Sequence, residues 1–523
     1  MTTVSYPIQG GDYARAGSAA SSIKQMLKQI GVEPAAIRRT MIATYEAEMN
    51  VVVHAASGLI RVRLDPGQID VEVVDQGPGI PDIALAMTEG FSTAPDEARE
   101  LGFGAGMGLP NIRRNSDHFT LESTAGRGTQ LRFTIRFAPQ AAAAAPPPRP
   151  SSDASACRGC LRCVRVCPTK ARRLRGGQPQ VLSHLCIGCG ACIAACPQGA
   201  LGVDGAADAV LPTLSGALVV PEAFLAQFGP GVPAERVVAA LRELGCDRVV
   251  ATSGWELALR QAVVAYARAE ATRRPVISPV CPAVVHLIAL RFPSLLPQVA
   301  PFESPVAAVA KSLAARPAAC AVACPAQQAE LALGEPPQMA AVSPKALREA
   351  ILPRLAPPTR ATCADSGERC PPPAAGPEPV LEVSGLRHVA RVLDDAENGR
   401  LGDITVVEPY ACDLGCCGSP LLAEDPFVAR RRRSAAHAAA GAEARAVRRR
   451  RELVPRPGLR LDGDMRKAIE KLSRIDALAK RLPGSNCGLC GAPTCAAFAE
   501  DVVMGRAAER DCVVLAGRQE DVP

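Results

Sequence analysis

The sequence predicts a multidomain chain of α/β and α+β folds, and three observations support this prediction. The chain has 523 residues, a length that usually divides into about three or four domains. Apolar residues at helical spacing alternate with strand-like segments in 1–137 and again in 213–428, which is the pattern of α/β domains. The 21 cysteines fall mainly into closely spaced groups, which indicates metal centres assembled where thiols stay reduced.

Composition and charge disfavour several classes of protein. Apolar residues make up 48% of the chain and aromatic residues only 3%, while the formal net charge is +7. This charge is modest and concentrated in one segment, so it does not mark the whole chain as nucleic-acid-binding. The chain does not begin with a basic segment followed by an apolar core, and no apolar run reaches the roughly 18 residues that span a bilayer. We therefore expect a cytoplasmic protein without a membrane span.

Two cysteine groups with identical spacing occupy residues 157–197. Each group reads C-x2-C-x2-C-x3-C-P, the spacing of bacterial two-cluster ferredoxins. Three thiolates separated by two residues can bind one 4Fe-4S cluster from a single loop, while the fourth cysteine reaches the other cluster. Zinc and disulfides are the alternatives, but zinc sites seldom use eight cysteines in a doubled pattern, and nothing indicates an oxidising compartment. The expected ligand sets are Cys157, Cys160 and Cys163 with Cys196, and Cys186, Cys189 and Cys192 with Cys167.

Residues 1–137 have the element pattern of one α/β domain. Apolar residues at helical spacing predict a first helix around residues 23–30, and a longer helix should follow over 34–55. Two alternating stretches separated by Pro66-Gly67 predict a hairpin. The strands expected in this domain are 60–64, 69–74, 119–122 and 130–137.

This domain carries four groups of polar and glycine residues in order along the chain. Glu46, Asn50 and His54 are spaced at i, i+4 and i+8, which places them on one face of the longer helix. Asp75 ends the second hairpin strand, and Thr129 follows a Gly-Arg-Gly turn. Glycines allow a backbone to approach phosphates closely and offer N–H groups at helix starts. The candidate glycines are Gly77 and Gly79 after Asp75, and Gly102, Gly104, Gly106 and Gly108 in the next loop.

Together the four groups resemble the ATP-binding domain of GHKL ATPases, an α/β sandwich, and in particular the anti-sigma-factor serine kinases. The resemblance covers nearly all of residues 5–137. It implies that Glu46 orients or deprotonates the attacking hydroxyl and that Asn50 holds Mg²⁺ beside ATP. A nucleotide-binding relic without transfer activity is the alternative, although both residues needed for the chemistry are present.

The same resemblance assigns roles to the remaining motifs. It implies that Asp75 accepts the adenine amino group, that Thr129 supports the adenine pocket and that Gly102–Gly108 form the phosphate lid. Because no phosphorylatable histidine motif precedes the domain, a histidine kinase is disfavoured. We expect His54 to pack or to cap its helix rather than to act in catalysis.

A linker and a second, larger α/β region complete the central part of the chain. Residues 138–156 are rich in alanine, proline and serine, which cannot form a core, and the prolines stiffen the spacer. After the ferredoxin module at 157–203, the domain at 213–428 contains three separated cysteine segments. Four cysteines from such segments can hold one 4Fe-4S cluster, although as buried free thiols they would need no function. These cysteines are Cys281, Cys324, Cys412 and Cys416.

The order and local sequence of these segments resemble the three signature loops of iron-only hydrogenases. The resemblance covers about 155–425 and implies that the four cysteines hold the cubane of an H-cluster, with Cys416 bridging to a diiron unit. Val280 stands in place of the proton-shuttling cysteine, Gln327 in place of a lysine that binds a diiron cyanide, and Tyr410 in place of a methionine. Because valine transfers no proton and glutamine carries no charge, we expect hydrogen turnover to be low or lost. A third 4Fe-4S cluster remains expected, with or without the diiron unit.

The C-terminal part contains a basic segment and another cysteine group. For the arginine-rich residues 429–463 we favour a solvated helix or connector, with a docking surface for an acidic partner as the alternative. Nucleic acid is disfavoured because no aromatic residues interleave.

An amphipathic helix over 465–482 leads into a segment that resembles a small 4Fe-4S domain of redox-complex and corrinoid proteins, with zinc as the alternative. Its cysteines are Cys487, Cys490, Cys495 and Cys512.

These parts together predict a redox- or hydrogen-responsive signalling protein whose clusters regulate an ATP-dependent serine/threonine kinase. The resemblance implies a small antagonist protein with a phosphorylatable serine or threonine as partner, and an electron donor is a second expected partner. The alternative is an electron-transfer protein or slow iron-only hydrogenase with a regulatory ATPase domain, and a scaffold with structural clusters is a third hypothesis. The missing proton-transfer residues count against the enzyme, and the ATP-site motifs count against the scaffold. The expected domain boundaries are 1–137, 138–156, 157–203, 213–428, 429–463 and 464–523.

Overall fold

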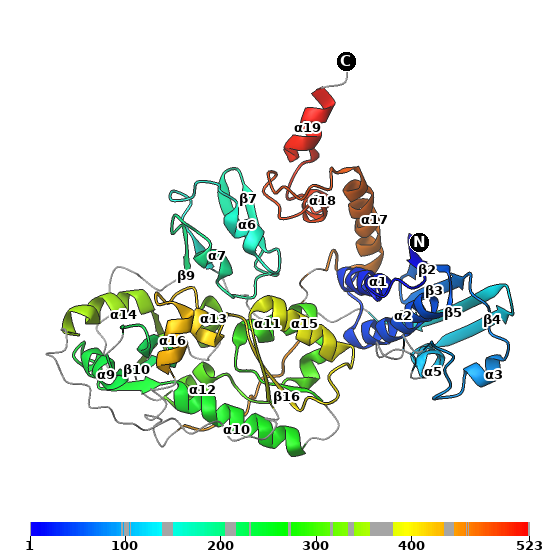
Figure 1. Cartoon of the computed structure of the whole chain (residues 1–523). Coiled ribbons are helices and arrows are strands. Elements are labelled where there is room, and N and C mark those ends of the chain that lie inside the picture. The colour runs from blue at the N-terminus through cyan, green and yellow to red at the C-terminus, as the bar shows by residue number, and fades with distance from the viewer. Residues whose placement is uncertain are drawn as a thin grey trace. The chain divides into compact units, whose positions relative to one another are not determined.

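The computed structural model divides the chain into two compact units (Figure 1). Unit 1 comprises 1–143 with 457–490 and 494–523, and unit 2 comprises 144–456 with 491–493. Among the described residues, no helix has both the length and the apolar character needed to cross a membrane. The residues described are 2–95, 98, 104, 106–138, 150–203, 216–229, 232–269, 274–313, 317–332, 339–355, 380–433, 444–456, 458 and 460–520.

A five-stranded antiparallel sheet with helices on one face forms the N-terminal domain of unit 1 (Figure 1). Its strands in sheet order are β1 (Thr2–Gln9), β2 (Ser57–Asp65), β3 (Gln68–Asp75), β5 (Gly128–Arg136) and β4 (His118–Thr124), and its helices are α1 (Ser18–Gln29), α2 (Pro34–His54), α3 (Ile83–Ala86) and α5 (Gly108–Arg114). Alternate side chains such as Ile60, Val71 and Phe133 are buried, and α2 contacts four of the strands. This alternation fixes the register, because a slip of one residue would expose the apolar set.

The first strand is a feature that the sequence pattern does not predict. Pro7 interrupts the alternating stretch, and proline removes a donor from a strand ladder. The structure accommodates it because β1 lies at the edge of the sheet and pairs only with β2, with Pro7 opposite Leu59. The helices and hairpin expected from the sequence are confirmed, although α1 begins at Ser18, earlier than the apolar spacing suggests.

The C-terminal segment of unit 1 packs on the N-terminal domain. Helix α17 (Met465–Arg481) contacts α1 and β1, and α18 (Cys495–Val503) packs on α17. Asp464 caps α17 by accepting hydrogen bonds from the N–H groups of Arg466 and Lys467 at 2.8 and 3.1 Å. Just before this cap, the N–H of Leu461 donates to the carbonyl oxygen of Gln29 at the end of α1 at 2.9 Å. The amphipathic helix expected from the sequence is confirmed, and its apolar face is used within unit 1.

Unit 2 begins with a small module of short strands and helices. Residues 150–152, which we expect in the linker, instead form a strand that pairs with residues 201–203, because the two ends of the module meet. Residues 139–149 of the expected linker lie outside the described residues. The elements are β6 (Pro150–Ser152), α6 (Arg162–Val166), β7 (Arg172–Arg175), β8 (Gln178–Val181), α7 (Ala191–Ala194) and β9 (Leu201–Val203).

Two parallel sheets form the larger part of unit 2. One has the order β11 (Arg248–Ala251), β10 (Ala217–Val220), β13 (Ala318–Ala321), β14 (Ala340–Val342), and the other β12 (Val276–Ile277), β16 (Val406–Tyr410), β15 (Val380–Ser384). The helices are α8 (Glu222–Leu225), α9 (Ala234–Arg242), α10 (Ser253–Ala269), α11 (Pro282–Arg291), α12 (Pro305–Ser312), α13 (Pro325–Ala332), α14 (Pro344–Ile351), α15 (Leu386–Glu397) and α16 (Pro426–Arg433). Every residue of β10 and β16 is buried, as expected for parallel sheets covered on both faces.

Part of the expected basic linker contacts the rest of unit 2, although most of its described arginines are exposed. In residues 444–456 the backbone of Val447 accepts from the N–H of Glu303, and Arg449 donates to the carbonyl oxygen of Pro301, at 2.9 and 3.0 Å. Arg456 is only 8% exposed and donates to three backbone carbonyls of the preceding module, those of Ser183, His184 and Cys186. Arg449 and Arg456 thus contact the rest of unit 2, while Arg445, Arg448, Arg450 and Arg451 are exposed, as expected for a solvated connector.

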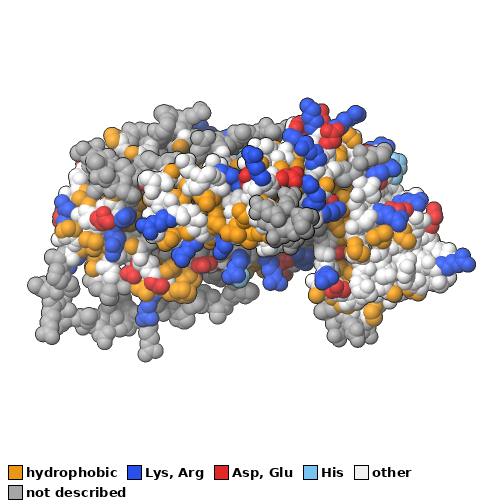
Figure 2. Space-filling view, turned by 90° about the horizontal axis from the view of Figure 1, so that it is seen from above, with side chains coloured by type: hydrophobic (Ala, Val, Ile, Leu, Met, Phe, Trp, Pro, Cys, Tyr) orange, Lys and Arg blue, Asp and Glu red, His pale blue; other side chains and the backbone are white. Residues whose placement is uncertain are grey.

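Charged side chains show no concentration on the face seen in Figure 2. Basic side chains are spread over that face with acidic ones among them. This distribution agrees with the modest net charge of +7 and differs from the basic stripe typical of nucleic-acid-binding surfaces.

Candidate functional site

Helix α2 presents two polar side chains to the start of α5 in unit 1. The amide nitrogen of Asn111 donates to Oε1 of Glu46 at 2.8 Å. A Cβ added at Gly108 would lie 3.3 Å from Oδ1 of Asn50 and 3.4 Å from Oε2 of Glu46. The first residue of α5 therefore lies directly against the two side chains, and its lack of a side chain keeps the space beside them open. Asn111 is a positioning residue that the sequence motifs do not indicate.

Asp75 is held in a fixed orientation at the end of β3. Its Oδ1 accepts from the N–H of Gly77 at 2.9 Å and from that of Thr129 at 3.1 Å. The Thr129 hydroxyl lies 3.0 Å from that of Ser123. Both backbone bonds use Oδ1, so they orient the carboxylate without engaging Oδ2. Asp75 and Thr129 are 54 residues apart, and the structure brings them together as the resemblance implies.

The glycine positions have the backbone freedom that the motif suggests. Gly79, Gly104 and Gly106 have φ angles of 73°, 92° and 69°, which side chains rarely adopt. Gly106 also accepts a hydrogen bond from the N–H of Gly90 at 3.0 Å. Gly102 lies outside the described residues, so its position in the loop stays a prediction.

Glu48 links the helix of this site to α1. It is 1% exposed, and its carboxylate accepts from the N–H groups of Gly17, Ala19 and Ala20 at 3.0, 3.2 and 3.0 Å. Burial raises the pKa of Glu48, while these N–H groups act in the opposite direction. A carboxylate at a helix N-terminus is stabilised by the unpaired N–H groups and the helix dipole. Sequence reasoning missed this residue because a lone glutamate has no distinguishing spacing.

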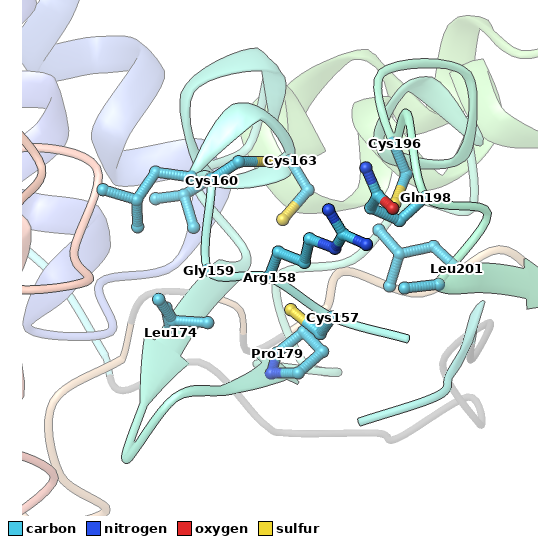
Figure 3. Close-up of a pocket in the computed structure, with 13 residues that line it drawn as sticks. Cys157, Arg158, Gly159, Cys160, Cys163, Leu174, Pro179, Cys196, Gln198 and Leu201 are labelled. Carbon is cyan, nitrogen blue, oxygen red and sulfur yellow. The ribbon is translucent and has the colours of Figure 1, made fainter. Parts of the chain in front are cut away.

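Two cavities of unit 2 are each lined by four of the expected cysteines. Figure 3 shows the first of them, with Arg158 and Gln198 among the other side chains at its wall. The empty volumes are about 400 and 330 Å³. Ligation itself stays a prediction, but the grouping is the one expected from the spacing. The first cavity is lined by Cys157, Cys160, Cys163 and Cys196, and the second by Cys167, Cys186, Cys189 and Cys192.

The surroundings of the second cavity favour bound thiolates. Arg172 is 1% exposed and donates to the sulfur of Cys192 at 3.3 Å, and the N–H of Ala171 donates to the sulfur of Cys167 at 3.2 Å. Burial raises the pKa of Cys186 to about 11, so its free thiol would be protonated at neutral pH. Metal binding at such a site must release protons and is coupled to the local fold.

A third cavity lies where three parallel strands of the larger domain end. Cys281 follows β12, Cys324 follows β13, and Cys412 and Cys416 follow β16. The carboxyl ends of parallel strands are the usual position of sites in α/β folds. The empty volume is about 390 Å³, and Val280, Gln327 and Tyr410 complete the wall. Cys189 lines both this cavity and the second one.

The C-terminal cysteines surround α18 of unit 1. Cys487 and Cys490 precede the helix, Cys495 begins it, and Cys512 follows it. The side chain of Asn486 accepts from the N–H of Cys495 at 2.8 Å, which fixes the loop onto the helix start. Within the described ranges, no three His, Cys, Asp or Glu side chains are grouped so that they could hold a single metal ion. Cluster binding by these four cysteines stays a prediction.

Comparisons with protein families match four parts of the chain. Residues 37–139 match the histidine kinase-, DNA gyrase B- and HSP90-like ATPase family, and residues 149–197 match the 4Fe-4S dicluster domain. Residues 217–326 match the C-terminal domain of the iron only hydrogenase large subunit, and 482–514 match an Fe-S cluster family. The fold and sites thus define a multidomain protein with a GHKL-type ATPase domain, ferredoxin and hydrogenase-like domains and a C-terminal Fe-S region.

Two proteins of known name are similar to the N-terminal domain. The chain is 34% identical over 113 residues to the serine/threonine-protein kinase RsbT of Bacillus subtilis, covering 21% of this chain and 79% of that protein. It is 39% identical over 98 residues to the anti-sigma F factor of Caldanaerobacter subterraneus, covering 18% of this chain and 64% of that protein. Through its N-terminal domain the chain belongs to the family of RsbT.

One solved structure that the comparison matches to this chain is an FeFe-hydrogenase HydA1 variant from Chlamydomonas reinhardtii. It matches 47% of this chain and 90% of its own length at 16% identity, with a TM-score of 0.35. A second is the mycobacterial sensor histidine kinase MprB, which matches 26% of this chain and all of its own length at 17% identity, with a TM-score of 0.18.

The contact between the second cysteine loop and the larger domain can be tested at Gly190. A Cβ there would lie 2.4 Å from Cγ of Pro420, at a φ of 75°. Gly190→Ala should therefore lower the temperature at which the cluster absorbance of anaerobic protein is lost. Gly177→Ala is the matched control, because its φ is 76° and an added Cβ meets nothing within 4 Å, so it adds only backbone strain of about 1–2 kcal/mol. Equal temperatures in the two variants would contradict the packing of this loop on Pro420.

Proposed function

We propose that the chain is a redox-responsive serine/threonine kinase, which phosphorylates a small antagonist protein under the control of its iron–sulfur clusters. The observation that carries this proposal is the composition of unit 1, which holds both the ATPase domain and the C-terminal cysteine segment. The family membership of the N-terminal domain supports the kinase activity and the class of substrate. The proposal assigns the chain to the cytoplasm, where thiols and clusters stay reduced.

In the proposed transfer, Glu46 orients the attacking hydroxyl of the substrate and Asn50 supplies an oxygen ligand to Mg²⁺. The fit of a cation beside Asn50 is supported by the open space that Gly108 leaves next to Oδ1 of Asn50. When bound, Mg²⁺ neutralises the charge that develops on the transferred phosphoryl group. Asn111 holds Glu46 in position through its 2.8 Å hydrogen bond, and Asp75 presents Oδ2 to the adenine amino group.

A continuous series of contacts within unit 1 supports coupling between the C-terminal cysteines and the ATP site. Helix α18 begins at Cys495 and packs on α17, and α17 packs on α1. The first N–H groups of α1 are accepted by Glu48, which lies on α2 between Glu46 and Asn50. A displacement of α17 would therefore reach the reacting groups through one buried carboxylate. Coupling requires that the two cluster redox states prefer different positions of this helix.

An electron-transfer protein or a slow hydrogenase is the second candidate, favoured by the three cysteine cavities of unit 2. Cys189 lines the second and third of them, so electrons could pass between clusters over a short distance. Val280 argues against fast hydrogen chemistry, because general acid–base groups contribute about 10²–10⁴-fold and valine supplies none. In the kinase proposal these clusters bring the redox signal and an electron donor supplies it.

The first test concerns Asn50. Asn50→Ala should abolish Mg²⁺-dependent phosphorylation of the antagonist because it removes an oxygen ligand of the cation, while the iron content stays unchanged. Asn50→Asp retains an oxygen ligand and should keep Mg²⁺-dependent nucleotide binding, which calorimetry can measure. Full phosphorylation by Asn50→Ala would refute the assignment of this site.

The second test concerns the redox response. Phosphorylation should differ by about 5–150-fold between oxidised and dithionite-reduced anaerobic protein, the usual range of coupling between two sites. Cys495→Ala should remove the response if the signal passes through unit 1, and Cys324→Ala tests a contribution from the third cavity. Identical rates in both redox states, with the clusters shown to be present, would defeat the regulatory proposal and leave the kinase assignment intact.

The third test concerns Glu48 as a positioning residue. Glu48→Gln replaces a two-oxygen acceptor by an amide with one acceptor oxygen, so part of the bonding to Gly17, Ala19 and Ala20 is lost. The ratio of oxidised to reduced phosphorylation rates should fall towards one, while ATP still binds. Glu122→Gln on the exposed side of β4 is the matched control and should keep the ratio. A Glu48→Gln protein with an unchanged ratio would exclude this route of coupling.

A further inference from the structure

The third cysteine cavity is lined by its expected set of four cysteines, as is each of the two cavities of the ferredoxin module. Cys281, Cys324, Cys412 and Cys416 line it, and Val280, Gln327 and Tyr410 complete its wall. Four cysteines around one cavity suit one 4Fe-4S cluster. A cubane joined to a diiron unit with carbonyl, cyanide and dithiolate ligands needs additional space beside Cys416.

Tyr410 is fixed at the wall of this cavity by a buried network. It is 7% exposed, and its hydroxyl donates to Oε1 of Glu408 at 2.8 Å. Glu408 is itself 3% exposed and accepts from Nε of Arg260 at 2.9 Å, while Nη2 of Arg260 donates to Glu382 at 3.1 Å. Moving the tyrosine ring away would break a bond to a buried charged group, which costs about 1.5–3 kcal/mol. The network therefore favours this position of the ring.

Gln327 and Val280, the other two departures from the hydrogenase pattern, offer no ligand to a second metal unit. Oε1 of Gln327 accepts from the N–H of Ala323 at 2.8 Å, so its carboxamide is held against its own loop, and the side chain is 7% exposed. Val280 adjoins Cys281 and presents only methyl groups. Ser419, the remaining polar side chain of the wall, donates to the carbonyl oxygen of Ala323.

From these contacts we infer that the third cavity holds a single 4Fe-4S cluster and excludes a diiron unit, because the ring of Tyr410 is held at its wall and neither Gln327 nor Val280 offers a group that could bind such a unit. The site then exchanges one electron at a time with the cluster beside Cys189, so that one cluster is oxidised as the other is reduced. It has no centre at which hydrogen could bind. The inference goes beyond the kinase proposal in one respect. The signal becomes the supply of low-potential electrons to the clusters, and not hydrogen itself.

The test uses the full-length protein with clusters reconstituted anaerobically. The protein is incubated with a synthetic diiron dithiolate complex that carries carbonyl and cyanide ligands, then desalted and examined by infrared spectroscopy and iron analysis. The wild-type protein should show no carbonyl or cyanide bands and no additional iron. Cys324→Ala should contain about four irons fewer per chain, which shows that the cavity holds a cubane. The variant Val280→Cys/Gln327→Lys/Tyr410→Met should gain the bands and about two irons.

Each outcome decides the inference without reference to kinase activity. Carbonyl and cyanide bands in the wild-type protein, together with about two additional irons per chain, would overturn it. Equal iron contents in the wild-type protein and Cys324→Ala would overturn it as well, because no cubane would then occupy the cavity. If the triple variant keeps its clusters but also fails to bind the complex, the three side chains are not the cause of exclusion. Tyr410→Phe serves as a control that keeps the ring, and it should still exclude the complex.

Discussion

The burial of cysteine thiols is the constraint on which unit 2 depends. Burial raises the pKa of Cys186 to about 11 and that of Cys324 to about 12, so neither would be a thiolate at neutral pH without a bound cation. Iron bound at these positions would displace protons, and its binding free energy would become part of the folding free energy. The short strands and the four- and five-residue helices of the small module form a limited apolar core of their own, so bound clusters and the contact with the larger domain would supply the remaining stability.

Spacing in the sequence predicts those parts of the sites that lie close together in the chain. The two ferredoxin ligand sets could be grouped from the repeat alone, and the structure places each set around one cavity. The third set could not be grouped from spacing, because Cys281 and Cys416 are brought together only by the parallel order of β12 and β16. Residues such as Glu48, Asn111 and Arg456 have no pattern at all. Their partners are backbone groups or single side chains far away in the sequence, which only the folded chain shows.

Unit 1 joins the GHKL-type ATPase domain and the C-terminal Fe-S region through helix packing. The apolar face of α17 packs on the N-terminal domain, where the helix contacts α1 and β1. In the kinase proposal, this contact with α1 is the one through which a signal would reach α2.

Arg456 has a consequence for the order in which the protein is made. Its guanidinium holds three carbonyl groups of the loop around Cys186, which precedes it by 270 residues. At about 5–20 residues per second, a ribosome needs roughly 15–50 seconds to synthesise that interval. During this time the loop of the second cysteine set exists without the side chain that fixes its backbone. Iron delivery to a growing chain would therefore meet an unfinished site, and completion of the loop follows only when residue 456 has left the ribosome.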